Sequence, residues 1–461
     1  MRITLPLVLE TAIAKLIEQG YRPVLVGGYV RDTLLNLPSK DIDIELFGVE
    51  NLEVLEPILA TFGKVNSVGK SFGVLKLQLG KIEVDFSIPR QEKKIARGHK
   101  GFEVRLDASL SFKAAAKRRD FSINAMGYDL ITKRLLDPFH GQEDLRVKRL
   151  DIVDEVSFIE DPLRLYRAMQ FVARFELTPS TRFMRLAKEM IANNMLAELP
   201  KERVFEEFKK LFLKSKQPSL GLTLLHQCNM LEHFAELKAL IGVQQDPTYH
   251  PEGDVWRHTL MVVDEMYLLH GADEKQNLYL SFAALCHDLG KANTTKVIGG
   301  RIRSIGHENS GIALSEQFLA RLTQEQQLID KVLTLVKHHL KPRQFYTQGA
   351  KSAAIRRLAR QVNIAELVLL ARADALGRTT EDALRREFKA GEWLLERAKN
   401  LHVVSKPLDP LLQGRDLIKV GLQPSKVFKT VLDKAYEAQL EGDISTHTEA
   451  ILWLQKELSN P

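Results

Sequence analysis

A glycine pair followed by two spaced aspartates constrains this chain more than any other sequence feature. Gly27 and Gly28 follow an apolar strand pattern, and glycines at such a turn let backbone N–H groups approach a phosphate at the start of the next helix. Asp41 and Asp43 accompany the next apolar strand, where side chains two residues apart point to one face. The segment therefore predicts a turn-and-strand unit that binds a triphosphate together with divalent metal ions.

Length and composition narrow the class of protein. The 461 residues exceed what one hydrophobic core organises, so we expect two to four domains. A net charge of +7 suits a polyanionic partner, and two cysteines speak against a disulfide framework and for a reducing compartment. Neither a signal-peptide core nor a membrane-spanning apolar run is present, so we expect a cytoplasmic protein with no membrane partner.

Secondary-structure patterns divide the chain into a mixed N-terminal part and a helical remainder. Strands are expected at residues 24–26, 42–47, 74–79 and 82–87, the last two forming a hairpin, and helices at residues 9–19, 52–62 and 109–118. From residue 157 onward helical periodicity dominates. We therefore expect an α+β fold, with a small mixed-sheet head over 1–150, an all-α neck over 151–220, a body over 221–400 and a helical tail over 401–461.

Several polar residues of the head suit phosphate and metal chemistry. Asp41 and Asp43 offer the hard oxygen ligands that Mg²⁺ or Mn²⁺ prefers, and Asp85 on the expected hairpin is either a third such carboxylate or a solvated strand residue. Arg31, just after the glycines, either grips triphosphate oxygens or is a surface charge. Asn124, which follows a basic run, can bond a ribose hydroxyl.

A second polar pair marks the start of the neck. Asp161 and Arg164 are three residues apart, which places them on one face of a helix beginning here. An acidic acceptor beside a guanidinium donor can read the Watson–Crick edge of a base. An ordinary ion pair at a helix N-terminus is the alternative.

Five motifs occur in a fixed order: G-G-x-V-R-D, D-x-D, R-R-D-F-S-I-N-A-M, D-P-x-x-G-x-x-D-L and E-D-P-L-R-x-x-R. This set resembles class II tRNA nucleotidyltransferases, the bacterial CCA-adding enzymes and the poly(A) polymerases close to them. The resemblance implies a DNA polymerase β-like head in which Asp41 and Asp43 bind catalytic Mg²⁺. It also implies that Asp161 and Arg164 select CTP or ATP without a template. The candidate residues for nucleotide binding are then Gly28, Arg31, Arg119, Asn124, Asp161, Arg164 and Arg167.

Two details of the head bear on this resemblance. Gln170 stands where the family often has arginine, which removes one expected phosphate contact. The basic connection over residues 89–110 resembles the flexible loop that full CCA-adding enzymes need for the last adenosine, and it therefore favours A addition.

The helical body carries a second set of polar residues. His258 precedes the adjacent pair His287 and Asp288 by one helix pair, and imidazoles with carboxylates suit Mn²⁺, Ni²⁺ or Fe²⁺, with Mg²⁺ possible. The pattern resembles the HD phosphohydrolase superfamily. That resemblance implies further ligands at His307 and Asp374 and at one of the pair 338–339, for which we favour His338 over its neighbour.

The two resemblances together predict a bifunctional enzyme. The head would add C and A nucleotides to tRNA 3′ ends from CTP and ATP, and the HD domain would hydrolyse phosphoesters such as 2′,3′-cyclic phosphates at RNA ends. An A-adding enzyme or a bacterial poly(A) polymerase is the alternative within the class. A metal-dependent phosphohydrolase with an RNA-binding head is the alternative from another class. The sequence leaves the HD metal open, and the oligomeric state open between monomer and homodimer.

Overall fold

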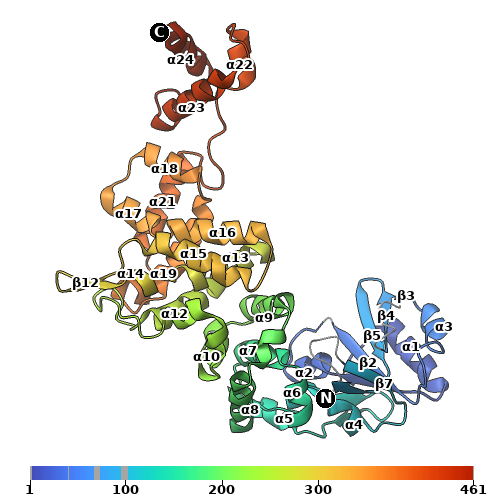
Figure 1. The fold of residues 1–461 in the computed structure, drawn as a ribbon. Helices are drawn as coiled ribbons and strands as arrows, with labels where there is room; N and C mark the ends of the chain where they lie inside the picture. The colour runs from blue at the N-terminus through green and yellow to red at the C-terminus, as the bar shows by residue number, and fades with distance from the viewer. Residues whose placement is uncertain (1–2, 40, 67–72, 95–101, 460–461) are drawn as a thin grey trace. The chain divides into compact units, whose positions relative to one another are not determined.

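The computed structural model describes residues 3–39, 41–66, 73–94 and 102–459, and it consists of two compact units (Figure 1). The first unit is Met1–His233 and the second is Phe234–Pro461. The expected head and neck fall in the first unit, and nearly all of the expected body and tail falls in the second. A mixed sheet occupies the first unit and helices dominate the second, so the expected α+β class is confirmed.

The sheet of the first unit has seven strands in the order β3-β4-β5-β2-β1-β8-β9. Its strands are β1 (Arg22–Val26), β2 (Ile42–Phe47), β3 (Lys64–Asn66), β4 (Val74–Leu79), β5 (Ile82–Ser87), β8 (Gly127–Asp129) and β9 (Arg134–Leu136). β2 and β5 pair in parallel and all other neighbours pair antiparallel. The hairpin expected between β4 and β5 is confirmed, and Gly80 at its turn has a φ of 59°.

The helices near this sheet are α1 (Leu7–Glu18), α2 (Gly28–Leu34), α3 (Glu56–Ala60) and α4 (Phe112–Ala116). Both α3 and α4 are shorter than the sequence pattern predicted. Before α3, the Asn51 side chain accepts the N–H groups of Glu53 and Val54, which makes a local turn in place of a first helical turn. α4 begins only after Ser111, whose hydroxyl oxygen accepts the N–H of Ala114 as an N-cap.

The basic connection over 89–110 contains a strand pair. β6 (Arg90–Lys94) and β7 (Phe102–Leu106) form an antiparallel two-stranded sheet. The part of the predicted flexible loop over 95–101 lies outside the described residues.

The rest of the first unit is built on packed aromatic rings. Phe121 lies 5.6 Å from Phe158 and 5.8 Å from Phe171, measured between ring centroids, and Phe158 lies 5.9 Å from Phe183. This cluster joins the R-R-D-F motif to the helices that follow it. These are η2 (Ser122–Asn124), α5 (Gly141–Arg146), α6 (Glu155–Glu160), α7 (Leu163–Phe175), α8 (Thr181–Ala192), η3 (Met195–Glu198), α9 (Lys201–Lys214), α10 (Pro218–Gln227) and η4 (Met230–His233), with the strand pair β10 (Arg149–Leu150) and β11 (Thr178–Pro179).

The second unit is a helical body in which α13 packs against α12, α16 and α19. Its helices are α11 (Ala235–Lys238), α12 (Val255–Leu268), α13 (Glu274–Cys286), α14 (Lys291–Thr294), α15 (His307–Ala320), α16 (Gln326–His338), α17 (Lys341–Gln348), α18 (Ser352–Ala359), α19 (Ile364–Leu376), α20 (Glu381–Leu384) and α21 (Lys389–Asn400). A small hairpin of β12 (Lys296–Ile298) and β13 (Arg301–Arg303) was not predicted.

The C-terminal tail consists of α22 (Gly414–Lys419), α23 (Lys426–Glu441) and α24 (His447–Ser459), which share a hydrophobic cluster of their own. α23 contacts α18 through ion pairs, with Glu437 lying 3.0 Å from Arg357 and 2.9 Å from Arg360. Within the described ranges, no helix combines the length and apolar character that crossing a bilayer requires.

Candidate active sites

The acidic site of the first unit lies on the neighbouring strands β2 and β5. Asp43 on β2 and Asp85 on β5 are direct partners in the parallel register, so both side chains leave the sheet on one face. Asp41 lies two residues before Asp43 and is exposed. Burial raises the pKa of Asp43, and the charges of Asp85 and Asp41 raise it further against the opposing effect of Arg119. Such mutual repulsion between carboxylates is relieved when a divalent cation binds among them.

The glycine turn approaches this site through Gly27. Its φ is 71°, and a Cβ at this position would lie 2.9 Å from Nη1 of Arg119 and 3.6 Å from Oδ2 of Asp43. The positive φ favours glycine here, and the absence of a Cβ leaves room for the Arg119 guanidinium. Gly28, which the sequence singled out, is the first residue of α2.

A buried polar network connects three of the predicted nucleotide-binding residues. Arg31 donates to Oδ1 of Asn124 at 2.5 Å and to its neighbour Asp32 at 2.6 Å. The Asn124 amide donates to Asp120 at 3.0 Å, and Arg167 donates to the other Asp120 oxygen at 2.6 Å. Both ends of the Asn124 side chain therefore have protein partners. Asp120 organises the network and was not among the predicted site residues.

Electrostatics and ring packing hold this network in place. Burial alone would raise the pKa of Asp120, but the adjacent guanidinium groups, Arg167 first, hold it below its ordinary value. The guanidinium of Arg31 lies 4.6 Å from the ring centroid of Phe175 and 5.3 Å from that of Phe171, and Arg167 also lies 5.3 Å from the Phe171 ring. Stacking on aromatic faces stabilises both cations.

The pair at the start of the neck is arranged differently from the prediction. α6 ends at Glu160 and α7 begins at Leu163, so Asp161 and Arg164 do not share one helical face. Asp161 accepts the N–H of Leu163 at 3.2 Å, whereas Arg164 donates to the backbone oxygens of Ser157 at 2.8 Å and of residue 118 at 2.6 Å. Both side chains are thus oriented by the junction between two helices.

The second unit brings together three histidines whose Nδ1 atoms make the same kind of backbone contact. In His287, His307 and His339, Nδ1 lies 2.8, 2.7 and 2.6 Å, respectively, from the backbone oxygen of the residue three positions earlier. A proton on Nδ1 satisfies each of these contacts, which leaves the Nε2 lone pair of each imidazole available to a metal ion.

Two aspartates and a fourth histidine complete this cluster. Nε2 of His287 and of His307 each lie 3.2 Å from an oxygen of Asp288, and Nε2 of His258 lies 3.1 Å from Asp374. The donor atoms form two adjacent groups, one of His258, His287 and Asp374 and one of Asp288, His307 and His339. Mixed nitrogen and oxygen donors in two adjacent groups suit a pair of divalent ions.

The prediction that favoured His338 needs a correction. His339 belongs to the cluster, with its Nε2 3.2 Å from Nε2 of His307, whereas His338 belongs to neither donor group. Successive residues of a helix point about 100° apart, so only one of two adjacent histidines faces the centre. Both pKa values are low, about 3 for His339 and about 4 for His338, chiefly because the imidazoles are buried.

Charged neighbours already compensate the aspartates of the cluster. Burial opposes ionisation, yet His287 and Lys291 hold the pKa of Asp288 well below its usual value, and Arg378 does the same for Asp374. The Lys291 ammonium lies 2.7 Å from Asp288, and the Arg378 guanidinium lies 2.6 Å from Asp374. Ionised carboxylates and neutral imidazoles are the forms that bind metals.

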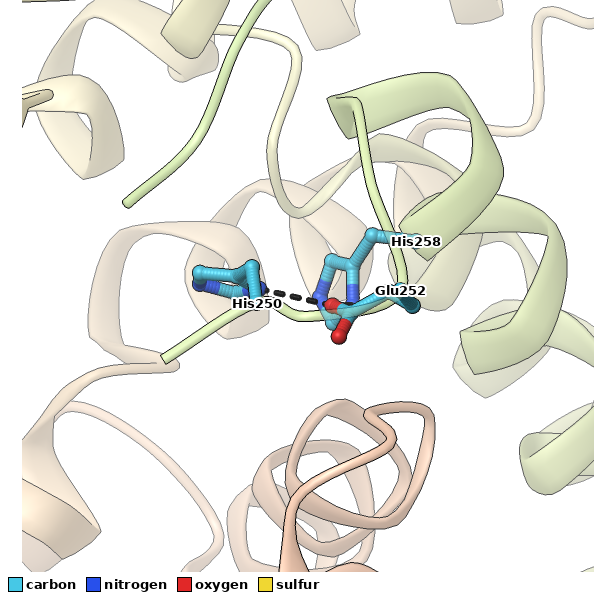
Figure 2. Close-up of side chains that lie close together, drawn as sticks. All are labelled: His250, Glu252 and His258. Atoms are coloured by element: carbon cyan, nitrogen blue, oxygen red, sulfur yellow. Dashed lines mark hydrogen bonds and ion pairs between the residues drawn. The ribbon is translucent and has the colours of Figure 1, made fainter. Parts of the chain in front are cut away.

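The buried carboxylate of Glu252 contacts His258 at Nδ1, the ring nitrogen that does not face Asp374 (Figure 2). Oε1 of Glu252 lies 2.9 Å from Nδ1 of His258 and 2.8 Å from Nδ1 of His250. Burial would raise the pKa of Glu252, but the hydrogen bonds from the two imidazoles hold it below its ordinary value. Neither Glu252 nor His250 was among the predicted site residues, although an acid and a histidine shortly before the helix that carries His258 were a usable signal.

Three known families match successive parts of the chain. Residues 24–151 match the family described as "Poly A polymerase head domain", and residues 255–379 match the "HD domain". Between them, residues 175–240 match the "Probable RNA and SrmB- binding site of polymerase A". Fold and matches together define a nucleotidyltransferase head joined to an HD phosphohydrolase domain.

Individual relatives identify the family more closely. The Multifunctional CCA protein of Cupriavidus metallidurans is 34% identical over 367 residues, which cover 77% of this chain and 84% of the relative. The protein of the same name from Xanthomonas axonopodis pv. citri is 34% identical over 419 residues, covering 87% and 94%. The chain belongs to the family of the multifunctional CCA proteins, and the resemblance found in the sequence is confirmed.

Solved structures share the fold at low identity. The Bacillus stearothermophilus CCA-adding enzyme in complex with CTP superposes with a TM-score of 0.67 at 20% identity, covering 99% of this chain and 98% of that one. The Thermotoga maritima CCA-adding enzyme complexed with tRNA gives a TM-score of 0.61 at 19% identity, covering 99% and 96%.

Proposed function

We propose that the first unit adds C and A nucleotides to the 3′ end of tRNA, from CTP and ATP and without a template. One observation carries this proposal: Asp43 and Asp85 are register partners on parallel strands, with Arg119 and the Gly27 turn beside them. Membership of the multifunctional CCA protein family supports the same reaction.

In this proposal Asp41, Asp43 and Asp85 hold divalent ions, for which Mg²⁺ fits the all-oxygen donor set. When bound, these ions neutralise the triphosphate and activate the attacking 3′-hydroxyl. Arg119 and the backbone of Gly27 and Gly28 face the phosphates. The network through Asp120 fixes Arg31, Asn124 and Arg167 behind them, and its rigidity keeps the nucleotide oriented for attack.

Selection of the base is assigned to Asp161 and Arg164 by their motif. Their positions at the junction of α6 and α7 support this role, because a junction fixed by backbone hydrogen bonds holds both groups in one orientation. An acceptor and a fixed donor distinguish cytosine and adenine from the other bases by hydrogen bonding.

For the second unit we propose hydrolysis of phosphoesters at RNA ends, such as 2′,3′-cyclic phosphates. The proposed metal ligands are His258, His287, Asp288, His307, His339 and Asp374. The nitrogen-rich donor set favours Mn²⁺, Ni²⁺ or Fe²⁺ over Mg²⁺. These residues would hold two divalent ions, which would supply Lewis-acid activation of water and of the phosphate, while Lys291 and Arg378 keep the carboxylates ionised.

The decisive experiment is nucleotide incorporation into tRNA that ends before its CCA sequence. Labelled CTP and ATP are supplied separately and together. Incorporation of C followed by a single A is the expected result. Incorporation of A alone, or a long run of A, would identify an A-adding enzyme or a poly(A) polymerase in its place. Incorporation of neither nucleotide would favour the phosphohydrolase alternative.

A further inference from the structure

A cavity of the HD-containing unit lies among α15, α16, α17 and α18. Its volume is about 440 Å³, within the range of small-molecule sites. The polar and aromatic side chains that matter most for its chemistry are Asn309, Lys337, His338, Lys341, Gln344 and Phe345.

This cavity adjoins the metal-binding cluster along two helices. Its lining residue His338 ends α16 and directly precedes His339, and its lining residue Glu308 directly follows His307 on α15. Adjacent histidines thus serve two different places, because His339 faces the cluster while His338 faces the cavity. Along each of these two segments, the cavity therefore lies within one residue of the cluster.

The charge of the cavity is suited to an anion. Among the described residues, the ammonium groups of Lys337 and Lys341 lie within 4 Å of no carboxylate. Arg357, also in the lining, is committed to Glu437 and Glu441 of the tail, and Glu308 is the one lining carboxylate. The uncompensated charge is therefore positive.

Two further groups favour a nucleotide over a simple anion. The Phe345 ring is half-buried and lies 5.8 Å from the Lys341 ammonium, measured to the ring centroid. A cation beside an aromatic face is the usual arrangement for binding single-stranded nucleic acid, in which bases stack on the ring and lysines follow the backbone. The His338 side chain is 6% exposed, and its Nδ1 has no hydrogen-bond partner among the described residues.

We propose that this cavity binds the RNA strand just 5′ of the terminal nucleotide whose phosphate enters the HD centre. Lys337 and Lys341 contact backbone phosphates and Phe345 stacks on a base. The proposal rests on the phosphohydrolase function proposed above.

The test compares two substrates in the full-length protein. One is a short RNA ending in a 2′,3′-cyclic phosphate, and the other is 2′,3′-cyclic AMP, which has no upstream phosphate. The double variant Lys337→Ala, Lys341→Ala should raise KM for the RNA roughly tenfold at unchanged kcat, and reduce the salt dependence of its binding by about one unit of slope per lysine. Hydrolysis of 2′,3′-cyclic AMP should not change.

The matched control is Lys296→Ala, Lys399→Ala, which removes the same charge at two exposed positions of the same unit. An equal loss in this control, an equal loss on both substrates, or no change with the RNA would each overturn the proposal. An independent readout is photo-crosslinking of a short 4-thiouridine RNA. Crosslinks within residues 337–345 support the proposal even if no hydrolysis is seen, whereas crosslinks confined to residues 1–233 contradict it.

Discussion

The two candidate active sites differ in how their carboxylates are stabilised: the pKa of Asp43 is raised in the first, and those of Asp288 and Asp374 are lowered in the second. In the first unit, acids on neighbouring strands repel one another, and the pKa of Asp43 is raised by its burial and by the other carboxylates. In the second unit, neighbouring histidines, a lysine and an arginine hold the pKa values of Asp288 and Asp374 well below their usual range. The carboxylates of the first site therefore favour a proton or a cation among them, whereas those of the second are held ionised by their neighbours.

The largest expected effect is the loss of nucleotide addition when the first site alone is altered. Asp43→Ala should reduce nucleotide addition at least about a thousandfold, because a metal ligand supplies several kcal/mol of transition-state stabilisation. Hydrolysis of 2′,3′-cyclic AMP should be unchanged. Radiolabelled CTP incorporation measures the loss, and Glu53→Ala, an exposed carboxylate of the same unit, is the control. Retained addition in Asp43→Ala would show that the acids on β2 are not the catalytic ones.

The adjacent histidines at the C-terminal end of α16 give a sharper test of the second site. His339→Ala should lower hydrolysis of 2′,3′-cyclic AMP on the order of a hundredfold and reduce the bound metal, because its Nε2 faces the Asp288 group. His338→Ala should retain the metal content of the unaltered protein. Elemental analysis of purified protein measures both. Metal loss in His338→Ala with none in His339→Ala would restore the expectation that the sequence suggested.

A third comparison concerns stability within the nucleotide network. Asp120→Asn leaves Arg167 without its buried counter-charge, and breaking such a pair costs about 3 kcal/mol of unfolding free energy. Because the pKa of Asp120 is depressed in the folded state, its contribution is present above its ordinary pKa and is lost as pH falls through the lower folded value. Urea unfolding at pH 7 measures the effect. The exposed acid in Glu143→Gln is the control and should show no change.

The smallest expected effect concerns Glu252, which contacts the proposed metal ligand His258 without being a proposed ligand itself. Glu252→Gln should weaken Mn²⁺ binding about tenfold to a hundredfold, since Glu252 orients His258 and increases its basicity. Glu308→Gln is the matched control. The Glu308 carboxylate lies 4.0 Å from His307, but Nδ1 of His307 contacts the backbone oxygen of Ser304 instead. Calorimetric titration of the metal-free protein with Mn²⁺ measures both affinities. Equal affinities in the two variants would show that Glu252 does not act on the metal site.

Local patterns were sufficient for much of the first unit. The bounds of β2, β4 and β5 match the prediction, because apolar alternation and the Gly80 turn are encoded by residues that contact one another. α3 and α4 were overestimated because hydrogen bonds from Asn51 and Ser111 replace helical turns, which hydrophobic periodicity does not report.

The sites were harder to predict where the partners are distant in sequence. Asp120 looked like part of a basic surface run, and only the fold shows that it is buried between Asn124 and Arg167. The choice between His338 and His339 depends on the rotation of one helix at its last turn. Glu252 precedes its helix in a turn, so no periodic pattern includes it.

The backbone contacts of the three cluster histidines affect how this centre tolerates substitution of the residues around it. Because each ring is aligned by a carbonyl of its own polypeptide segment, no neighbouring side chain is needed to choose its tautomer. Substitutions of the side chains around the cluster are therefore expected to leave the hydrogen-bonded orientation of each of these rings intact.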